Sequence, residues 1–175
     1  MSATVGDSAA ATVYVAVPVD DAFDVFTNEI DLWWRRGRRF RISGKRPGRI
    51  VFEPRLGGRL FETAELASGA RVFEVGTVVE WDPPRRLALE WRGVNFKPHE
   101  KTIVEVTFTP SGDGTFVRVE HRGWSALSPE HPARHGLVGA AFARRIGLWW
   151  GGLLSSLREH VLTRSAPTPE DAGES

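Results

Sequence analysis

The sequence predicts an α+β fold in which a curved antiparallel sheet of about seven strands wraps around a long C-terminal helix, with two short helices after the first strand. Two observations carry this prediction. Residues 48–124 contain six segments in which apolar and polar residues alternate, separated by short turn sequences. After Pro132, apolar residues instead recur at helical spacing for roughly 30 residues. A sheet with one apolar face must be covered, and only this last helix is long and apolar enough.

The spacing of apolar residues distinguishes a first strand from the two short helices that follow it. Valines at alternate positions predict a strand over residues 12–17, which Pro18 ends. From Val19 the spacing of apolar residues becomes helical, and two short helices are expected over about residues 20–34. Asp20 is a suitable N-cap for the first helix, because its carboxylate can accept hydrogen bonds from the first turn.

Turn chemistry divides the middle of the chain. Gly-Gly, Ala-Ser-Gly-Ala, Asp-Pro-Pro and Ser-Gly-Asp-Gly sequences stand between the apolar segments. Because these turns are short, we expect an antiparallel meander with one buried face and one wetter face. The expected strands are residues 48–54, 55–66, 71–81, 85–91, 101–110 and 115–124.

The C-terminal helix is predicted to have a broad apolar and aromatic inner stripe. Gly147, Gly151 and Gly152 each lower helix propensity by about 1 kcal/mol relative to alanine, so we expect them to serve close packing or to leave space. The stripe consists of Val138, Phe142, Ile146, Trp149, Trp150, Leu153, Leu157 and Val161.

Length and composition favour one soluble domain. The 175 residues can bury a substantial core but are too few for two comfortable domains. We expect residues 1–10 to be a flexible N-terminus, residues 11–164 the single domain, and residues 165–175 a disordered tail. No apolar run reaches the roughly 18 residues of a membrane span. The N-terminus has no basic region typical of a secretory signal, so a cytoplasmic location is expected.

Cysteine content and charge exclude several classes of function. The chain has no cysteine, which excludes disulfides, thiolate catalysis and cysteine-ligated metal clusters. The net charge of +1 gives no general case for nucleic-acid binding. Residues 35–49 nevertheless hold eight basic residues in fifteen. They could steer an anionic ligand or partner, or form a solvated loop and edge strand whose charges discourage edge pairing.

Four sequence blocks carry a family resemblance. In order they are EPRLGGRLFE, GTVVEWDPPRRLALEWR, GDGTFVRVEHRGW and LWWGGLLSSL, within residues 13–162. Together they resemble the activator of heat-shock-protein-90 ATPase homologue branch of the START-like, or SRPBCC, superfamily, to which the birch allergens belong. The resemblance implies a helix-grip fold with an internal cavity, and many members bind hydrophobic ligands or lipids. The double tryptophan at Trp33 and Trp34 also resembles actinobacterial START-like proteins that include an enediyne self-resistance protein.

His121 is the sharpest candidate for a functional polar residue. It alternates with Val117 and Val119, so its side chain should point where apolar residues point. It could hydrogen bond a ligand, act as a general base, or be a structural histidine satisfied by its neighbours. No serine or cysteine nucleophile motif accompanies it, so no catalytic residue is assigned.

Metal and cofactor binding are not predicted. His131 and His135 are four residues apart, but Pro132 lies between them near a helix start and the zinc-binding pattern H-E-x-x-H is missing. The sequence LGGR reads as a turn, and no helix follows it to form a phosphate loop.

Inward-facing aromatic residues predict the walls of a cavity between sheet and helix. Arg59, Arg92 and Asn95 could supply polar contacts at its mouth or be solvated, while strand parity does not place Phe61 or Phe96. The expected ligand-binding residues are Trp33, Trp34, Phe52, Phe73, Trp91, Phe108, His121, Trp124, Phe142, Ile146, Trp149 and Trp150.

The leading hypothesis is a non-enzymatic protein that binds a hydrophobic small molecule or lipid, with His121 as a polar anchor. The alternatives are a chaperone-activator-like or other interaction module with a cytosolic partner, and a polyketide cyclase, aromatase or enediyne self-resistance protein. An exposed edge strand makes a homodimer a further expectation. The sequence does not name the ligand.

Overall fold

The computed structural model of the chain describes residues 6–93 and 95–165. Seven strands and three α-helices follow one another, with two short 3-10 turns, Trp124–Ala126 and Pro132–Arg134, between the last strand and the last helix. The elements are β1 (Ser8–Val15), α1 (Val19–Asn28), α2 (Ile30–Trp33), β2 (Gly48–Phe52), β3 (Arg59–Leu66), β4 (Gly69–Asp82), β5 (Arg86–Trp91), β6 (Thr102–Ser111), β7 (Gly114–Arg122) and α3 (Gly139–Ser165).

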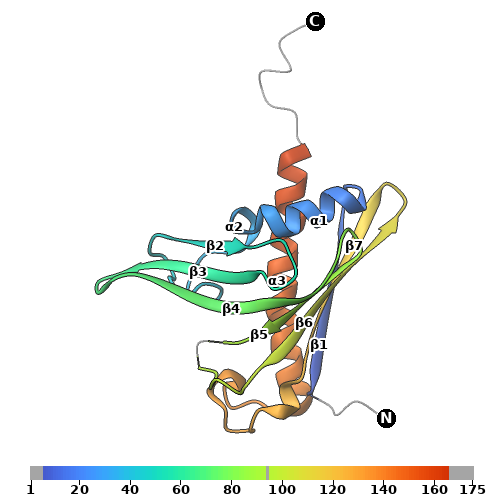
Figure 1. The fold of residues 1–175 in the computed structure, drawn as a ribbon. Helices are drawn as coiled ribbons and strands as arrows, with labels where there is room; N and C mark the ends of the chain where they lie inside the picture. Colours follow the sequence, from blue (N-terminus) through green and yellow to red (C-terminus); the bar gives the residue numbers. More distant parts are fainter. Residues whose placement is uncertain (1–5, 94, 166–175) are drawn as a thin grey trace, which may run out of the picture.

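The strands form one antiparallel sheet in the order β1-β7-β6-β5-β4-β3-β2. The first strand therefore pairs with the last, and β1 and β2 are the two edges. Figure 1 shows α3 running behind the sheet, with α1 and α2 near its C-terminal half. The predicted α+β helix-grip fold is confirmed.

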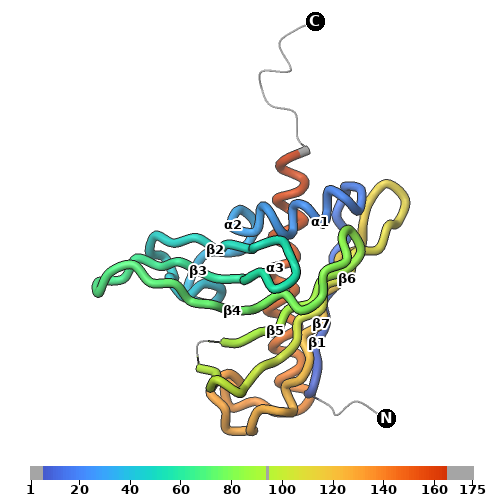
Figure 2. Tube along the Cα trace, viewed as in Figure 1, coloured from blue at the N-terminus to red at the C-terminus, as the bar shows by residue number. Residues whose placement is uncertain are grey.

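Two β-bulges bend the sheet on the side of β3 and β4. The register shifts between Leu60 and Phe61 in β3 and between Val78 and Glu80 in β4. A bulge adds a residue to one strand and increases its local twist. Figure 2 shows the result, since β2, β3 and β4 project to one side while β1 and β7 lie along α3.

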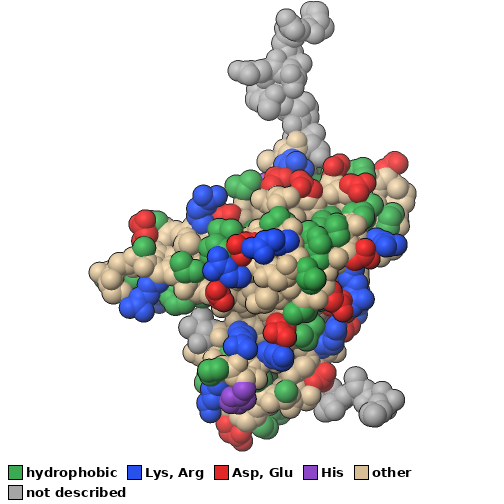
Figure 3. Space-filling model, viewed as in Figure 1, with side chains coloured by type: hydrophobic (Ala, Val, Ile, Leu, Met, Phe, Trp, Pro, Cys, Tyr) green, Lys and Arg blue, Asp and Glu red, His purple; other side chains and the backbone are tan. Residues whose placement is uncertain are grey.

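The core fills the space between the sheet and the helices, as the alternation predicts. Leu87, Leu89 and Trp91 of β5 are buried, and so are the corresponding residues of β6 and β7. The opposite face carries charged residues such as Glu90, Glu105, Arg118 and Glu120 among apolar and neutral ones, and Figure 3 shows acidic and basic side chains mixed on the face that it draws. No helix in the described ranges is long and apolar enough to cross a membrane.

Several predicted boundaries are corrected. Strand β1 begins at Ser8, four residues before the predicted start, because Ser8–Ala11 pair with β7 although their side chains are small or polar. Pro18, not Asp20, occupies the N-cap position of α1, and Asp20 lies in the first turn. Val138 was predicted on the inner stripe of the last helix but precedes that helix and is 56% exposed.

The predicted terminal segments lie mostly outside the described residues. Residues 1–5 of the expected flexible N-terminus and 166–175 of the expected tail are not described. Within the long helix, nothing lies within 4 Å of a Cβ built at Gly151, while Cβ atoms at Gly147 and Gly152 would meet Ala10 and Phe40 at 3.6 Å. These distances are ordinary contacts, so none of the three positions sterically requires glycine.

Candidate functional site

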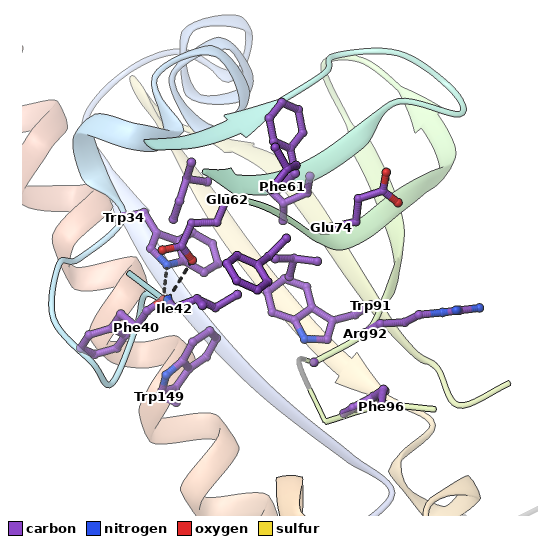
Figure 4. Close-up of a pocket in the computed structure, with 16 residues that line it drawn as sticks. Trp34, Phe40, Ile42, Phe61, Glu62, Glu74, Trp91, Arg92, Phe96 and Trp149 are labelled. Atoms are coloured by element: carbon purple, nitrogen blue, oxygen red, sulfur yellow. Dashed lines mark hydrogen bonds between the residues drawn. The ribbon is translucent and has the colours of Figure 1, made fainter. Parts of the chain in front are cut away.

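Two neighbouring clefts open between the sheet and α3. The first, which we call the apolar cleft, has a volume of about 510 Å³ and is walled mainly by aliphatic and aromatic side chains. Figure 4 shows Phe40 and Trp149 on its α3 side and Phe61 and Glu74 on its strand side. Its lining residues are Trp34, Phe40, Ile42, Ile50, Leu60, Phe61, Glu62, Val72, Phe73, Glu74, Val75, Trp91, Arg92, Gly93, Phe96 and Trp149.

The second cleft, which we call the arginine cleft, has a volume of about 990 Å³. It lies along the N-terminal half of α3 and shares Trp91, Gly93, Phe96 and Trp149 with the apolar cleft. The remaining lining residues are Arg38, Arg39, Asn95, His121, Trp124, Ala133, His135, Ala141, Arg144, Arg145, Ile146 and Leu148.

Tryptophan rings form the partition between the clefts. The Trp149 ring on α3 packs edge-on against Trp34 at 5.8 Å and against Trp91 at 6.3 Å between ring centroids. The Trp149 Nε1 donates to the Arg39 carbonyl at 2.8 Å, and the Trp34 Nε1 donates to the Phe40 carbonyl at 3.0 Å. Because both indole N–H groups already have protein partners, these two tryptophans can offer a ligand their apolar ring surfaces.

A buried arginine, Arg41, fixes the loop after α2 that begins at Trp34. Arg41 is only 3% exposed, and its guanidinium donates to the Asp31 carboxylate at 2.7 Å and to the Trp34 carbonyl at 2.6 Å. Burial acts to raise the pKa of Asp31, but hydrogen bonds from Ile50 N and Arg41, with the charges of Arg41 and Arg36, outweigh it and lower the pKa. This pair holds the loop after α2 against β2.

Glu62 holds the same loop from β3. Its buried carboxylate accepts hydrogen bonds from the backbone N–H groups of Ile42, at 2.9 Å, and Ser43, at 2.8 Å. Figure 4 shows this carboxylate turned toward Ile42. The basic stretch 35–49 is therefore partly anchored: Arg41 is buried, whereas Arg38 and Arg39 remain exposed beside the arginine cleft.

His121 is buried behind the arginine cleft with both ring nitrogens engaged. The Trp150 indole, which can only donate, lies 3.2 Å from Nδ1, so Nδ1 accepts and the proton of the neutral ring is on Nε2. Nε2 donates to Thr102 Oγ1 at 2.7 Å, and that hydroxyl donates to the Trp91 carbonyl at 3.3 Å. Burial lowers the pKa of His121 to about 3, so the imidazole is neutral at physiological pH. Contact with a ligand's polar atom would require one of these bonds to break.

The structure divides the predicted wall residues into two groups. Seven of the twelve line one or both clefts: Trp34, Phe73, Trp91, His121, Trp124, Ile146 and Trp149. The other five, Trp33, Phe52, Phe108, Phe142 and Trp150, are buried in the packed core, and neither cleft includes them. All twelve face inward, but facing inward did not distinguish a cleft wall from a core position.

Sequence reasoning missed several lining residues. Phe40 and Ile42 were hidden by the charges around them, and Phe61 lies on the opposite face of β3 from the buried Leu60 and Glu62, beside the bulge that Val75 makes in β4. The four arginines of the arginine cleft were visible in the sequence as basic clusters, since Arg38 and Arg39 belong to the basic stretch 35–49 and Arg144 and Arg145 are adjacent. Among the polar candidates, Arg92 and Asn95 line the clefts, whereas Arg59 pairs with Glu53 at 2.8 Å and Glu74 at 3.2 Å.

The histidines considered as metal ligands have other settings. His131 Nε2 lies 3.2 Å from the Glu100 carboxylate, and its Nδ1 accepts from Ala133 N at 3.1 Å. His135 is exposed and has a positive φ of 50°. Within residues 6–93 and 95–165, no cluster of three or more histidine, cysteine, aspartate or glutamate side chains could hold a metal ion.

Comparison with known proteins adds a family and a set of solved folds. Residues 16–144 match the model of the family described as "Activator of Hsp90 ATPase homolog 1-like protein". No curated protein matches the sequence. One similar structure is PFC0360w, an HSP90 activator from Plasmodium falciparum, with 20% identity, a TM-score of 0.58, and coverage of 90% of this chain and 97% of that chain.

Two further similar structures have other origins. CalU16 from Micromonospora echinospora has 17% identity and a TM-score of 0.52, covering 92% of this chain and 76% of that chain. DynU16, a putative protein in the dynemicin biosynthetic locus, has 18% identity and a TM-score of 0.59, covering 90% of this chain and 48% of that chain. At these identities the likeness concerns the fold alone.

Proposed function

Because the chain belongs to the Activator of Hsp90 ATPase homolog 1-like family, we propose that it binds a hydrophobic small molecule or lipid in the cavity between its sheet and α3. Helix-grip domains of this superfamily typically enclose such ligands. The observation that carries the proposal is the apolar cleft, about 510 Å³ in volume and walled by aromatic rings. Small-molecule sites usually occupy roughly 300–1,000 Å³ and are lined mainly by apolar side chains.

The chemistry of the walls suits binding better than catalysis. Among the described residues, neither cleft is lined by a serine, threonine, cysteine, lysine or tyrosine that could serve as a nucleophile. His121, the histidine considered as a base, has both nitrogens hydrogen bonded within the protein. Aromatic side chains, by contrast, offer large apolar surfaces at little cost in side-chain entropy. The proposal therefore assigns no chemical step.

Titration with N-phenyl-1-naphthylamine, a neutral aromatic probe that fluoresces in apolar sites, tests the proposal. Trp149→Ala removes one of the aromatic rings that line both clefts and should weaken binding by about tenfold, corresponding to about 1.4 kcal/mol. Phe116→Ala is the matched control, because Phe116 is an exposed aromatic residue on β7 that lines neither cleft. Equal affinities for the wild type and Trp149→Ala would contradict the proposed site.

A second candidate function is that of a chaperone-activator-like interaction module. Family membership and the likeness to the HSP90 activator from Plasmodium falciparum support it. The exposed residues Lys45, Arg46 and Arg49 would offer a partner a basic surface. Reversing these charges should abolish stimulation of a chaperone ATPase while leaving probe binding intact. Stimulation that survives the reversal would remove this surface from the hypothesis.

A polycyclic aromatic ligand, such as a polyketide, is a narrower form of the leading proposal. The likeness to DynU16, from the dynemicin biosynthetic locus, supports it together with the edge-on tryptophans around the apolar cleft. Mass spectrometry of the protein incubated with a polyketide would separate reversible binding from turnover or covalent modification. Modification that requires His121 would instead favour the cyclase or self-resistance alternative.

A further inference from the structure

The arginine cleft carries charge of one sign. Arg38 and Arg39 reach it from the loop after α2, and Arg144 and Arg145 reach it from α3. Within the described ranges, none of the four makes an ion pair, and no aspartate or glutamate lines the cleft. The outer face of the sheet is different, since its arginines pair with glutamates: Arg86 with Glu80 and Glu105, Arg118 with Glu120, and Arg122 with Glu105 and Glu120.

Tertiary packing brings the two arginine pairs together. The Trp149 Nε1 bond to the Arg39 carbonyl, at 2.8 Å, ties the loop to α3. Arg145 lies one helical turn before Trp149, so the two share a face of α3. Ala141, Arg144, Arg145 and Leu148 follow the i, i+3, i+4, i+7 pattern of a single face along the cleft. Gathering unpaired positive charges is unfavourable unless an anion is bound between them.

The other polar groups of this cleft can donate hydrogen bonds, and none is negatively charged. Asn95 and His135 line it alongside the arginines. Trp124 also lines it, and the buried Trp124 Nε1 has no hydrogen-bond partner among the described residues. A buried N–H without an acceptor costs about 1–3 kcal/mol. The Trp124 N–H is itself enclosed, so the donors that the cleft offers to an acceptor-rich group are those of the arginines, Asn95 and His135.

The apolar cleft favours an anion less. Its lining includes Glu62, Glu74 and one basic side chain, Arg92. Glu74 pairs with Arg59, and the Glu62 carboxylate accepts hydrogen bonds from backbone N–H groups, so an anionic group is better placed among the four arginines of the other cleft. Trp91, Phe96 and Trp149 line both clefts, and the Trp91 and Trp149 rings pack against each other, so aromatic surface lies between the arginines and the apolar walls. One ligand can therefore contact both clefts in only one favourable orientation, with its charged group among the arginines.

We infer that the ligand of the proposed site is an amphipathic organic anion, a conclusion that rests on the proposed binding function. Its carboxylate or sulfonate group is bound by the four arginines of the cleft, Arg38, Arg39, Arg144 and Arg145. Its apolar body lies against Trp91 and Trp149. Arginine suits this task because its planar guanidinium donates two parallel hydrogen bonds to such a group. The arginines then set specificity, and the aromatic surface supplies most of the affinity.

Two fluorescent probes with the same aromatic skeleton test the inference. 8-Anilinonaphthalene-1-sulfonate carries a sulfonate, whereas N-phenyl-1-naphthylamine lacks it. The wild type should bind the sulfonate more tightly, and this preference should shrink as salt is added. Arg38→Gln/Arg144→Gln should weaken sulfonate binding by about tenfold and leave binding of the neutral probe within about twofold. Circular dichroism should show that the double variant retains its fold.

Arg46→Gln/Arg158→Gln is the matched control, because it removes the same charge at exposed residues that line neither cleft. This variant should keep the wild-type preference for the sulfonate. Equal loss of preference in both double variants, or none in the cleft variant, would overturn the inference while the binding of the neutral probe still supported the proposed function. Failure of both probes to bind the wild type would overturn both.

Discussion

Replacing His121 should change how the stability of the protein depends on pH. Burial lowers the pKa of His121 from its ordinary value of 6.5 to about 3 in the folded state. The unfolded chain therefore takes up a proton below pH 6.5 that the folded chain refuses until about pH 3. His121 therefore leaves the free energy of unfolding unchanged well above pH 6.5 and lowers it as the pH falls toward 3.

The loss of stability at low pH can be calculated from the change in the pKa of His121 on folding. Each pH unit between the two pKa values is worth about 1.36 kcal/mol, so stability at about pH 5 should be roughly 2 kcal/mol lower than at about pH 7.5 because of His121 alone. His121→Gln removes this contribution. A glutamine amide can still accept a hydrogen bond from Trp150 and donate one to Thr102, so the variant should remain folded.

Urea unfolding followed by tryptophan fluorescence at several pH values between 7.5 and 5, at constant ionic strength, measures the difference. The wild type should lose about 2 kcal/mol more than His121→Gln over this range. His99→Gln is the control, because His99 is exposed and its removal should leave the wild-type pH dependence in place. Parallel loss of stability in the wild type and His121→Gln would refute the conclusion that the folded protein holds this imidazole neutral.

Three further substitutions test the packing of the fold. Arg41→Met removes the buried partner of Asp31 and should lower the free energy of unfolding by about 3 kcal/mol in urea titrations; a loss below about 1 kcal/mol would show that the pair does not hold the loop. Gly151→Ala should raise thermal stability by about 1 kcal/mol, since the added methyl group meets open space, and a lower melting temperature would contradict this. Gly114→Ala should instead cost about 1–3 kcal/mol because its Cβ would overlap Tyr14, and calorimetry showing no change would refute the overlap.

The inward-facing side of each strand was predictable because side chains alternate across a pleated backbone. The order of β2 to β7 followed from short turns, and the covering helix followed from its apolar stripe, whereas the pairing of β1 with β7 was not predicted. The alternation of side chains did not predict which inward-facing residues reach a cleft and which are buried in the core. Trp33 and Trp34 are adjacent and both buried, yet only Trp34 reaches a cleft, because the Trp33 indole bonds the carbonyls of Val25 and Phe26 at 3.2 Å.

Interactions between distant residues determined the rest of the site. The loop after α2 looked solvated because of its charges, but Arg41 finds Asp31 ten residues earlier and Glu62 binds the loop backbone from β3. The same loop presents Arg38 and Arg39 to arginines more than 100 residues later in the sequence. Local pattern contains no information on such pairings, which arise when the sheet closes around α3.

His121 shows how a polar residue on an apolar face can identify a site without revealing its role there. Its neutral ring accepts from Trp150 on α3 and donates to Thr102 on β6, which in turn bonds the Trp91 carbonyl. Trp150 packs against Trp91 at 5.6 Å between ring centroids, so this chain of bonds fixes the aromatic wall from behind. An imidazolium would present a second donor to the Trp150 N–H, whereas the neutral ring matches both neighbours. The same burial that lowers the pKa thus suits His121 to positioning the wall, and leaves the exposed arginines to meet a ligand's charge.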